Sequence, residues 1–436
     1  MGVQSTLFYV TAYISLFTSM FFLYTFWDNY SSSMKRAPPA KIPKVTVVVP
    51  AFNEQECIAA TIESLLKLNY PKEKLEIIVV DDGSTDKTYE IAKKYDGGNV
   101  RVFTKKNGGK GSALNFAIKK SKGEFVGALD ADSFVHPDAL INMVGYFEDP
   151  NIMAVTPALK VYNKNSILPK IQVVEYLMGV FLRKVFAMLG SIHVTPGPFT
   201  IYRKFFFKQY GGYDEKNITE DIEIALRIQS KNYQIENAMD ACVYTMSPTG
   251  FRELLWQRVR WYLGFIDNVL NHKNLFGFKH GILGVLVLPM AFFSVALAVG
   301  AFFFTSVLFA INLRDQISGL SAINYDVIPL IKAYFEHFHL NFIFTSNMFF
   351  LIVLLGLSVV MLYLAIKKSF ETGNKHLIIS YGIYMFLYWI LFSIWWIAAL
   401  GYKVCGKQLK FGGVAWDNSL LSKCRRNNNG RQESNQ

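Results

Sequence analysis

Four uncharged apolar stretches limit what this chain can fold into. Each has the length that a helix needs to cross a bilayer, and none contains Asp, Glu, Lys, Arg or His: they are 7–27, 282–311, 342–366 and 377–402. Since a chain in lipid must satisfy its own backbone polar groups, each stretch predicts a transmembrane helix. The least secure is 282–311, which is long for one helix, short for two, and open to interruption at Pro289.

Basic residues beside these stretches predict their orientation. Basic residues follow the first stretch (Lys35, Arg36, Lys41 and Lys44) and separate the third from the fourth (Lys367, Lys368 and Lys375), so both loops are expected in the cytoplasm. The N-terminus then lies outside, and the protein is expected in the cell membrane as a multi-pass protein. Four crossings also place the C-terminus outside, whereas the Lys and Arg residues of the tail, 403–436, favour the cytoplasm. The sequence leaves this conflict open.

The composition agrees with a mixed membrane protein. The 436 residues are 52% hydrophobic and 15% aromatic, and the net charge is +12. Much of the positive charge lies beside apolar segments or in the tail, which suits anionic membrane lipids. No nucleic-acid-binding motif is present, so nucleic acid is not an expected partner. The cysteines, Cys57, Cys242, Cys405 and Cys424, form no CxxC pair and indicate neither a zinc site nor a disulfide framework.

Between the first two spans, strand and helix patterns alternate. Short apolar runs at 45–49, 75–80, 100–103 and 124–129 predict strands, with helical patterns in the gaps. The alternation predicts a mainly parallel sheet with helices on both faces, as in Rossmann-like α/β domains. Ligands bind such sheets at the carboxyl ends of the strands, where acidic residues follow two of the runs.

Two later segments combine an apolar face with charged residues. Residues 167–189 and 251–270 each contain Lys or Arg, so they are too polar to span and predict amphipathic helices lying in the membrane surface.

The acidic residues that follow the strands suit metal and nucleotide chemistry. Asp130 and Asp132 are spaced to hold a hard divalent cation, which would neutralise a departing nucleoside diphosphate. Asp82 is placed to accept hydrogen bonds from a nucleobase or ribose, and Lys110 to reach phosphate. Solvated turns and a plain Gly-rich loop are the alternatives for these short segments.

Two further groups suit a transfer reaction. Asp221 begins a helical segment, where it is either a helix-capping residue or a general base toward an acceptor hydroxyl. Gln257, Arg260 and Trp261 share one face of a helix, where the Arg suits a diphosphate and the indole a sugar ring. A surface helix with an anchoring Trp is the alternative.

Taken in order, these segments resemble the membrane-integrated family 2 glycosyltransferases, which include synthases of poly-N-acetylglucosamine, hyaluronan, chitin and cellulose. The resemblance covers about residues 45–265 and the pattern of spans. The segments that carry it are Pro50-Ala51-Phe52-Asn53-Glu54, Asp81-Asp82-Gly83-Ser84, Gly109-Lys110-Gly111, Asp130-Ala131-Asp132, Thr219-Glu220-Asp221 and Gln257-x-x-Arg260-Trp261.

The resemblance implies a GT-A fold, a UDP-sugar donor, Mg²⁺ or Mn²⁺, and inversion to a β-linkage. It implies nucleotide-sugar binding by Pro50, Ala51, Asn53, Glu54, Asp81, Asp82, Lys110 and Asp130, and metal binding by Asp130 and Asp132. It implies catalysis by Asp221 as base, with Glu220 beside it. It implies acceptor and diphosphate binding by Gln257, Arg260, Trp261, Pro196 and Gly197.

The expected organisation follows from the spans and the resemblance. Residues 1–44 form an N-terminal transmembrane helix and basic linker, 45–250 a cytoplasmic GT-A domain, and 251–280 an amphipathic interface helix. Residues 281–402 contain about three transmembrane helices, and 403–436 form a basic, partly disordered tail.

The expected function is processive synthesis and extrusion of a β-linked polysaccharide, with UDP-GlcNAc as the favoured donor. The alternative is transfer of one sugar to a membrane lipid, so the acceptor is a polysaccharide or is lipid-linked. The pattern leaves room for accessory membrane subunits. In the last span Tyr381, Tyr384, Tyr388 and Trp395 form an aromatic face, which predicts either polymer stacking or simple helix packing.

Overall fold

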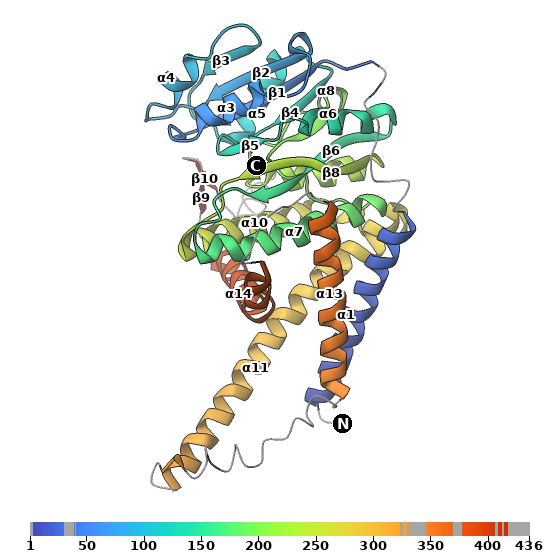
Figure 1. Ribbon diagram of the computed structural model, residues 1–436, viewed down its shortest axis with the longest axis vertical. Coiled ribbons are helices and arrows are strands. Elements are labelled where there is room, and N and C mark those ends of the chain that lie inside the picture. The colour runs from blue at the N-terminus through green and yellow to red at the C-terminus, as the bar shows by residue number, and fades with distance from the viewer. Residues whose placement is uncertain are drawn as a thin grey trace, which may run out of the picture.

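An eight-stranded sheet supports the upper part of the protein, and long helices extend from below it (Figure 1). The computed structural model describes residues 3–29, 39, 41–322, 326–328, 332, 346–368, 377–405, 409–411 and 414–416. Parts of four predictions lie outside these residues: the first residues of the span 342–366, the Lys35 and Arg36 flank, Lys375 of the loop between the last two spans, and most of the tail.

The first half of the sheet is parallel. Its order is β3-β2-β1-β4, built from β1 (Val45–Ala51), β2 (Leu75–Asp81), β3 (Val100–Thr104) and β4 (Phe125–Ala128). These strands confirm the four predicted ones. β1 and β2 are buried almost throughout, which explains why they are continuous apolar runs in the sequence.

The second half makes the sheet mixed. Beyond β4 the order continues β7-β6-β8-β5, with β5 (Ser133–Val135), β6 (Ile152–Val161), β7 (Thr200–Arg203) and β8 (Gln234–Thr245). β7 is antiparallel to both β4 and β6, β6 and β8 are parallel, and β5 is antiparallel to β8. The whole is a mixed, mainly parallel sheet of the expected class.

Helices cover both faces of the sheet, as predicted. On one face lie α3 (Ile58–Leu66), α4 (Thr88–Lys93) and α6 (Ala139–Val144), and on the other lie α5 (Lys110–Lys120), α8 (Lys204–Tyr210) and α9 (Glu220–Ser230). Alternate residues of β1 enter the two cores, Val47 on the first face and Val48 on the second. Short 3-10 turns occur at Lys72–Lys74, Gly145–Glu148, Lys273–Leu275 and Phe278–His280.

The two predicted amphipathic helices form the underside of this domain. They are α7 (Ile167–Met188) and α10 (Phe251–Asn271), and α7 packs against β6 and β8. Their ends match the predicted segments closely.

Among the described residues, four helices are long and apolar enough to cross a membrane. They are α1 (Val3–Asp28), α11 (Leu288–Ala322), α13 (Ser346–Lys368) and α14 (Leu377–Cys405). α11 extends beyond the predicted end at residue 311, and Pro289 does not interrupt it. A π-helical turn at Leu283–Val287 leads into α11 and contains Val285, whose carbonyl the Pro289 ring would otherwise meet.

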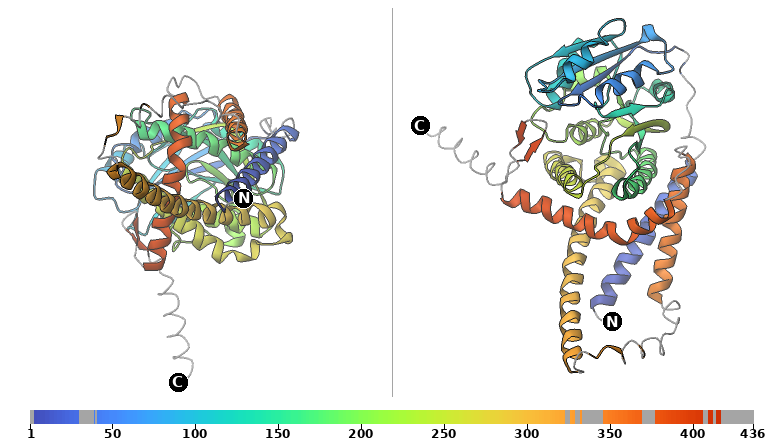
Figure 2. Two further views of the ribbon diagram at one scale, coloured as in Figure 1. Left: turned by 90° about the horizontal axis from the view of Figure 1, so that it is seen from below. Right: turned by 60° about the vertical axis from the view of Figure 1, so that its left-hand side comes forward.

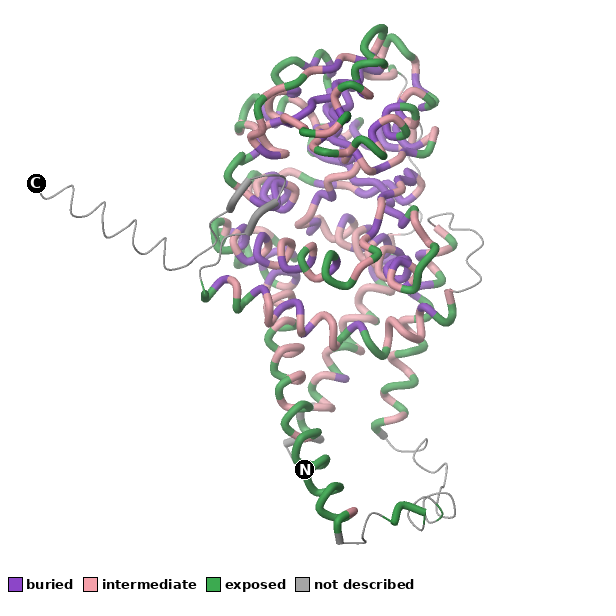
Figure 3. The backbone as a smooth tube through the Cα atoms, turned by 90° about the vertical axis from the view of Figure 1, so that its left-hand side faces the viewer, coloured by how far each residue is buried: buried purple, intermediate pink, exposed green. Residues whose placement is uncertain are grey.

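The four helices do not share one direction. α1, α11 and α13 extend away from the sheet domain, whereas α14 runs across its underside, below α7 and α10 (Figure 2). Buried residues concentrate in the sheet domain, while the extended helices are exposed over much of their length (Figure 3). After α14, β9 (Leu409–Phe411) and β10 (Val414–Trp416) pair as an antiparallel hairpin.

Candidate active site

Carboxylates from distant parts of the chain meet around one lysine. Lys110, at the start of α5, places its Nζ 2.6 Å from Asp130 Oδ1 and 3.0 Å from Glu220 Oε1. Burial alone would disfavour the charge of Lys110, but Asp130, Glu220 and Asp221 outweigh burial and raise its pKa. Three predicted site residues from the β4 end, α5 and α9 therefore form one ionic cluster.

Two further carboxyl groups, those of Asp132 and Glu54, lie close enough to this cluster to be repelled by Asp130. Burial, followed by repulsion from Asp130, raises the pKa of Asp132 to about 6. Burial and then repulsion from Asp132 and Asp130 raise the pKa of Glu54 to about 7. Each of these carboxyl groups resists ionisation because it is buried and because negative charge is already dense there.

A glycine lets a loop approach the cluster directly. A Cβ on Gly197 would lie 2.6 Å from Lys110 Nζ and 3.1 Å from Asp130 Oδ2. The neighbouring carbonyl of Pro196 accepts a hydrogen bond from the Thr200 hydroxyl at 2.6 Å, which holds the loop against β7. Any side chain at position 197 would displace the ion pair.

Asp221 lies in the first turn of α9, next to Glu220. Burial first, and then repulsion from Glu220, raise the pKa of Asp221 to about 6, although Lys110 and Arg260 oppose that shift. Thr195 donates to the Asp221 carbonyl from its backbone N–H at 3.2 Å and from its hydroxyl at 2.8 Å. The start of α9 is therefore fixed to the loop that carries Gly197.

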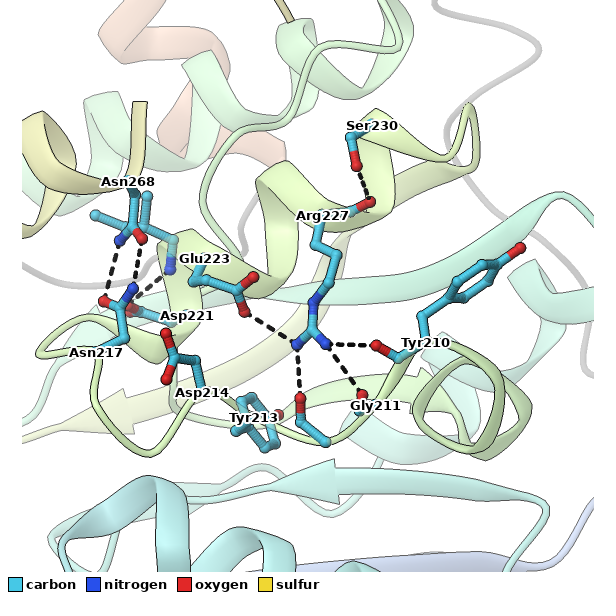
Figure 4. Close-up of polar contacts among 12 residues, drawn as sticks. Tyr210, Gly211, Tyr213, Asp214, Asn217, Asp221, Glu223, Arg227, Ser230 and Asn268 are labelled. Atoms are coloured by element: carbon cyan, nitrogen blue, oxygen red, sulfur yellow. Dashed lines mark hydrogen bonds and ion pairs between the residues drawn. The ribbon is translucent and has the colours of Figure 1, made fainter. Parts of the chain in front are cut away.

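Helix α10 packs closely against the start of α9. A Cβ on Gly264 would lie 2.0 Å from Thr219 Oγ1, so the two helices meet where only glycine fits. Asn268 Nδ2 donates to Asn217 Oδ1 at 3.2 Å (Figure 4) and to Thr219 Oγ1 at 2.9 Å. Arg260 Nη1 donates to the Ile218 carbonyl at 3.2 Å, which places its guanidinium near Asp221.

A second group of contacts fixes the segment before α9. Arg227 bonds to the carbonyls of Tyr210 and Gly212 at 2.9 and 2.7 Å, and pairs with Glu223 at 2.9 Å (Figure 4). These contacts tie α9 to the loop after α8.

The Trp261 ring is in contact with Arg258 of the same helix. The Arg258 guanidinium lies 4.2 Å from the centre of the Trp261 ring and 2.6 Å from Glu175 Oε2 of α7. Gln257 Oε1 is buried and accepts no hydrogen bond within the described residues. A buried acceptor without a donor suits a ligand that brings hydroxyl groups.

The residues predicted to bind the nucleotide are bonded among themselves. Asp82 accepts from Lys105 Nζ at 2.6 Å and from the Gly109 N–H at 2.7 Å, so it shapes the loop that leads into α5. Asp81 accepts from Thr104 at 2.8 Å. Asn53, in the left-handed region with φ 56°, accepts from the Thr85 N–H at 2.8 Å. Pro50 and Ala51 end β1 beside Asp81.

Asp130 and Asp132 are the candidate oxygen ligands for the metal that the resemblance implies. No three His, Cys, Asp or Glu side chains within the described residues form a ready metal cage. Asp130 and Asp132 offer oxygen ligands, and the Lys110 ammonium already occupies Asp130 as a cation would. Mg²⁺ commonly takes one or two carboxylates and completes its shell with phosphate and water, so these residues fit it.

Comparison with known proteins identifies the domain. Residues 46–211 match the family model "Glycosyl transferase family 2". This part of the chain is a family 2 glycosyltransferase domain. The match contains the β1 to α8 region and therefore the Lys110–Asp130 pair and Gly197.

Two curated relatives extend the similarity beyond the glycosyltransferase domain model. A poly-beta-1,6-N-acetyl-D-glucosamine synthase of Staphylococcus aureus is 35% identical over 254 residues, 56% of this chain and 60% of the relative. The synthase of the same name from Staphylococcus epidermidis is 35% identical over 231 residues, 51% of this chain and 55% of the relative. The chain thus matches less than two thirds of the length of each.

A solved structure shares the fold. A mannosyltransferase from Pyrobaculum calidifontis, in complex with GDP-Man and Mn²⁺, superimposes with a TM-score of 0.53 at 17% identity, covering 91% of this chain and 97% of that one. At this identity the likeness concerns the fold alone, and it confirms the expected GT-A class.

Several residues that organise the candidate site were not predicted. Gly264, Asn268 and Arg258 all lie on α10, within or just after the Gln-x-x-Arg-Trp segment. A glycine inside an otherwise regular helix is the one signal that pointed to a close contact, since glycine there is unfavourable without a packing reason. The predicted roles of the site residues remain predictions.

Proposed function

We propose that this protein is a processive, inverting glycosyltransferase that builds a β-linked polysaccharide from a UDP-sugar, with UDP-GlcNAc as the favoured donor. The names of the staphylococcal relatives support a polysaccharide product and N-acetylglucosamine as its unit. We place the glycosyltransferase domain in the cytoplasm, because its nucleotide-sugar donor is water-soluble. We propose that the polymer leaves along the membrane helices.

The observation that carries the proposal is the position of Asp221. Its carboxyl group lies at the N-terminus of α9, within the electrostatic reach of Lys110, Asp130 and Arg260. With a pKa of about 6 it is mainly a carboxylate at pH 7, yet more basic than an ordinary aspartate. Such a group is suited to accept a proton from a sugar hydroxyl as that hydroxyl attacks.

The reaction then follows from the charges around Asp221. The acceptor oxygen bonds to the anomeric carbon, its proton passes to Asp221, and the bond from that carbon to the diphosphate breaks. Lys110 and Arg260 are the cations placed to receive the negative charge of the departing UDP. Attack from the face opposite the leaving group inverts the configuration.

A divalent cation belongs to the proposal as well. Asp130 and Asp132 would hold Mg²⁺ or Mn²⁺, which when bound supplies further neutralisation of the diphosphate. With donor present, Lys110 would exchange Asp130 for phosphate.

The acceptor side is assigned to α10 and the loop of Pro196 and Gly197. The Trp261 ring provides a flat apolar surface for a sugar, and Gln257 Oε1 an acceptor for a sugar hydroxyl. The aromatic face predicted in the last span is a separate matter. Tyr388 and Trp395 are buried against residues of α7 and α10, so helix packing accounts for them.

The proposal is tested with purified protein in lipid nanodiscs. Labelled UDP-GlcNAc and Mn²⁺ should yield UDP and a high-mass product that a β-N-acetylglucosaminidase degrades. UDP-glucose and UDP-glucuronate serve as donor controls. A single organic-extractable sugar-lipid would instead establish transfer to a membrane lipid, and no UDP release with any donor would refute the assignment.

A further inference from the structure

Helix α14 contacts other helices near its start, in its middle and near its end. Near its start the Tyr381 hydroxyl donates to Ser358 Oγ of α13 at 2.8 Å. In its middle Tyr388 donates to Glu175 of α7. Near its end the Tyr402 ring lies 5.2 Å from that of Trp256 of α10. The contacts therefore run from α13, past α7, to α10.

The contacts of α14 with α10 are specific as well as continuous. Trp396 stacks on Tyr262, with ring centres 4.3 Å apart and an angle of 5° between planes. Lys403, 4% exposed in its side chain, pairs with Asp267. α10 and α7 belong to the glycosyltransferase domain's underside, and they contain charged residues that hydrocarbon does not tolerate unpaired.

Length decides between crossing the membrane and lying along it. From Tyr381 to Lys403 a helix advances roughly 33 Å, about the thickness of the hydrocarbon core. A helix that crossed the bilayer would carry one end that far from the domain. α14 instead stays against α7 and α10, with Leu377 and Tyr381 packed on the cluster that contains α7 and Lys403 beside Asp267 of α10, and it runs across the direction of α1, α11 and α13 (Figure 2).

The exposed face of α14 is strongly apolar. Ile379 is 65% exposed, Phe386 79% and Val404 66%, and these positions lie on one side of the helix. The opposite side packs on α7 and α10. A helix with protein on one side and lipid on the other is apolar all round. Such a helix has the composition of a transmembrane helix even though it does not cross the membrane.

We propose that α14 lies parallel to the plane of the membrane without crossing it, with its exposed face against the acyl chains of a phospholipid bilayer. α1, α11 and α13 cross the bilayer and continue from the same surface. With this arrangement the chain after Cys405 stays on the glycosyltransferase side. The basic residues of 403–436 are then on the cytoplasmic side that their charge favours.

Depth measurements test the position of α14. Spin labels are attached singly at Ile379→Cys, Phe386→Cys and Val404→Cys in a cysteine-free background, and their immersion in nanodiscs is read from oxygen and nickel-chelate accessibility. We expect similar depths at all three, because α14 does not cross the bilayer. Labels at Phe349, Leu355 and Tyr363 on α13 are the control, with the middle one deepest. A Phe386 label near the bilayer centre, with the other two near opposite surfaces, would overturn the proposal.

Sidedness gives an independent test. A variant that keeps Cys405 as its one cysteine is labelled with a membrane-impermeant maleimide in inside-out and right-side-out vesicles. Lys67→Cys marks the glycosyltransferase side and Ser318→Cys the far end of α11. Cys405 should react in the same vesicles as Lys67→Cys; reaction alongside Ser318→Cys refutes the proposal. Protease access to a C-terminal epitope decides the matter where Cys405 is shielded by lipid. Neither readout requires sugar transfer.

Discussion

Asp221 combines burial with dense charge, and this defines its expected behaviour. Asp221→Asn keeps the size of the side chain but removes the proton acceptor, so sugar transfer should fall by about 10²–10⁴-fold. UDP affinity should change little, because Lys110 and Asp130 are untouched. Donor turnover and UDP calorimetry measure the two effects. Asp214→Asn, at an exposed position a short distance before α9, is the control and should retain activity.

The same residue predicts the pH profile. Because the Asp221 carboxyl must be ionised to accept a proton and its pKa is raised to about 6, activity should fall below that pH. The expected slope is roughly tenfold per pH unit, measured as kcat/KM for the donor at saturating Mn²⁺. An ordinary aspartate would place this limb near pH 4. A limb at that lower pH contradicts the assignment of Asp221.

The raised pKa of Glu54 predicts how stability depends on pH and on metal. Its folded-state pKa of about 7 exceeds the ordinary 4.5, so the folded protein loses stability as pH rises between these values. Glu54→Gln removes that loss. In EDTA at pH 8 the variant should therefore have a higher apparent Tm than the wild type, and the gap should close near pH 4. Mn²⁺ should narrow the gap at pH 8 by relieving the repulsion from Asp132. Equal Tm values at pH 8 in EDTA would contradict this account.

At the scale of elements, the sequence predicted what depends on local pattern. β1 and β2 are buried on both sides, so their apolar runs marked them, and α7 and α10 followed from helical periodicity. β6, β7 and β8 were missed, because their antiparallel and crossover pairings join residues far apart in the chain. The direction of α14 could not be predicted, because contacts with lipid and contacts with protein both require apolar residues. The ion pairs of Lys110 could not be read from spacing, since they depend on how α5 and α9 pack.

The contact between α9 and α10 makes an element-scale prediction. Gly264→Ala places a methyl group 2.0 Å from Thr219 Oγ1, so the start of α9 and Asp221 must shift. A displacement of 1 Å at a catalytic group costs about 10²-fold in rate. We expect that loss in polymer synthesis. Gly179→Ala on α7 is the matched control, because a Cβ there meets no other atom within 4 Å, and it should leave the rate unchanged. Equal activity of the two variants would contradict the close contact.

At the scale of the whole molecule, one buried cluster joins the site to the membrane helices. Arg258 of α10 pairs with Glu175 of α7, which also accepts a hydrogen bond from Tyr388 of α14. The Arg258 guanidinium lies between the Trp261 and Trp395 rings, at 4.2 and 5.6 Å from their centres. The orientation of Trp261 therefore depends on an ion pair between α10 and α7, to which Tyr388 of α14 adds a hydrogen bond.

Glu175→Gln tests this dependence. The change leaves Arg258, 1% exposed, without its anion, and breaking a buried pair costs roughly 3–5 kcal/mol. Because the Glu175 side chain is 25% exposed, the lower end applies. Stability should fall, and product chains should shorten as Trp261 loses its fixed orientation, while the KM for the donor stays unchanged. Tyr388→Phe removes one hydrogen bond, worth about 0.5–1.5 kcal/mol, and should shorten the product less. Thermal unfolding and gel sizing of the polymer measure both variants. An altered donor KM with normal product length would show that the cluster acts on the nucleotide site, and not through Trp261.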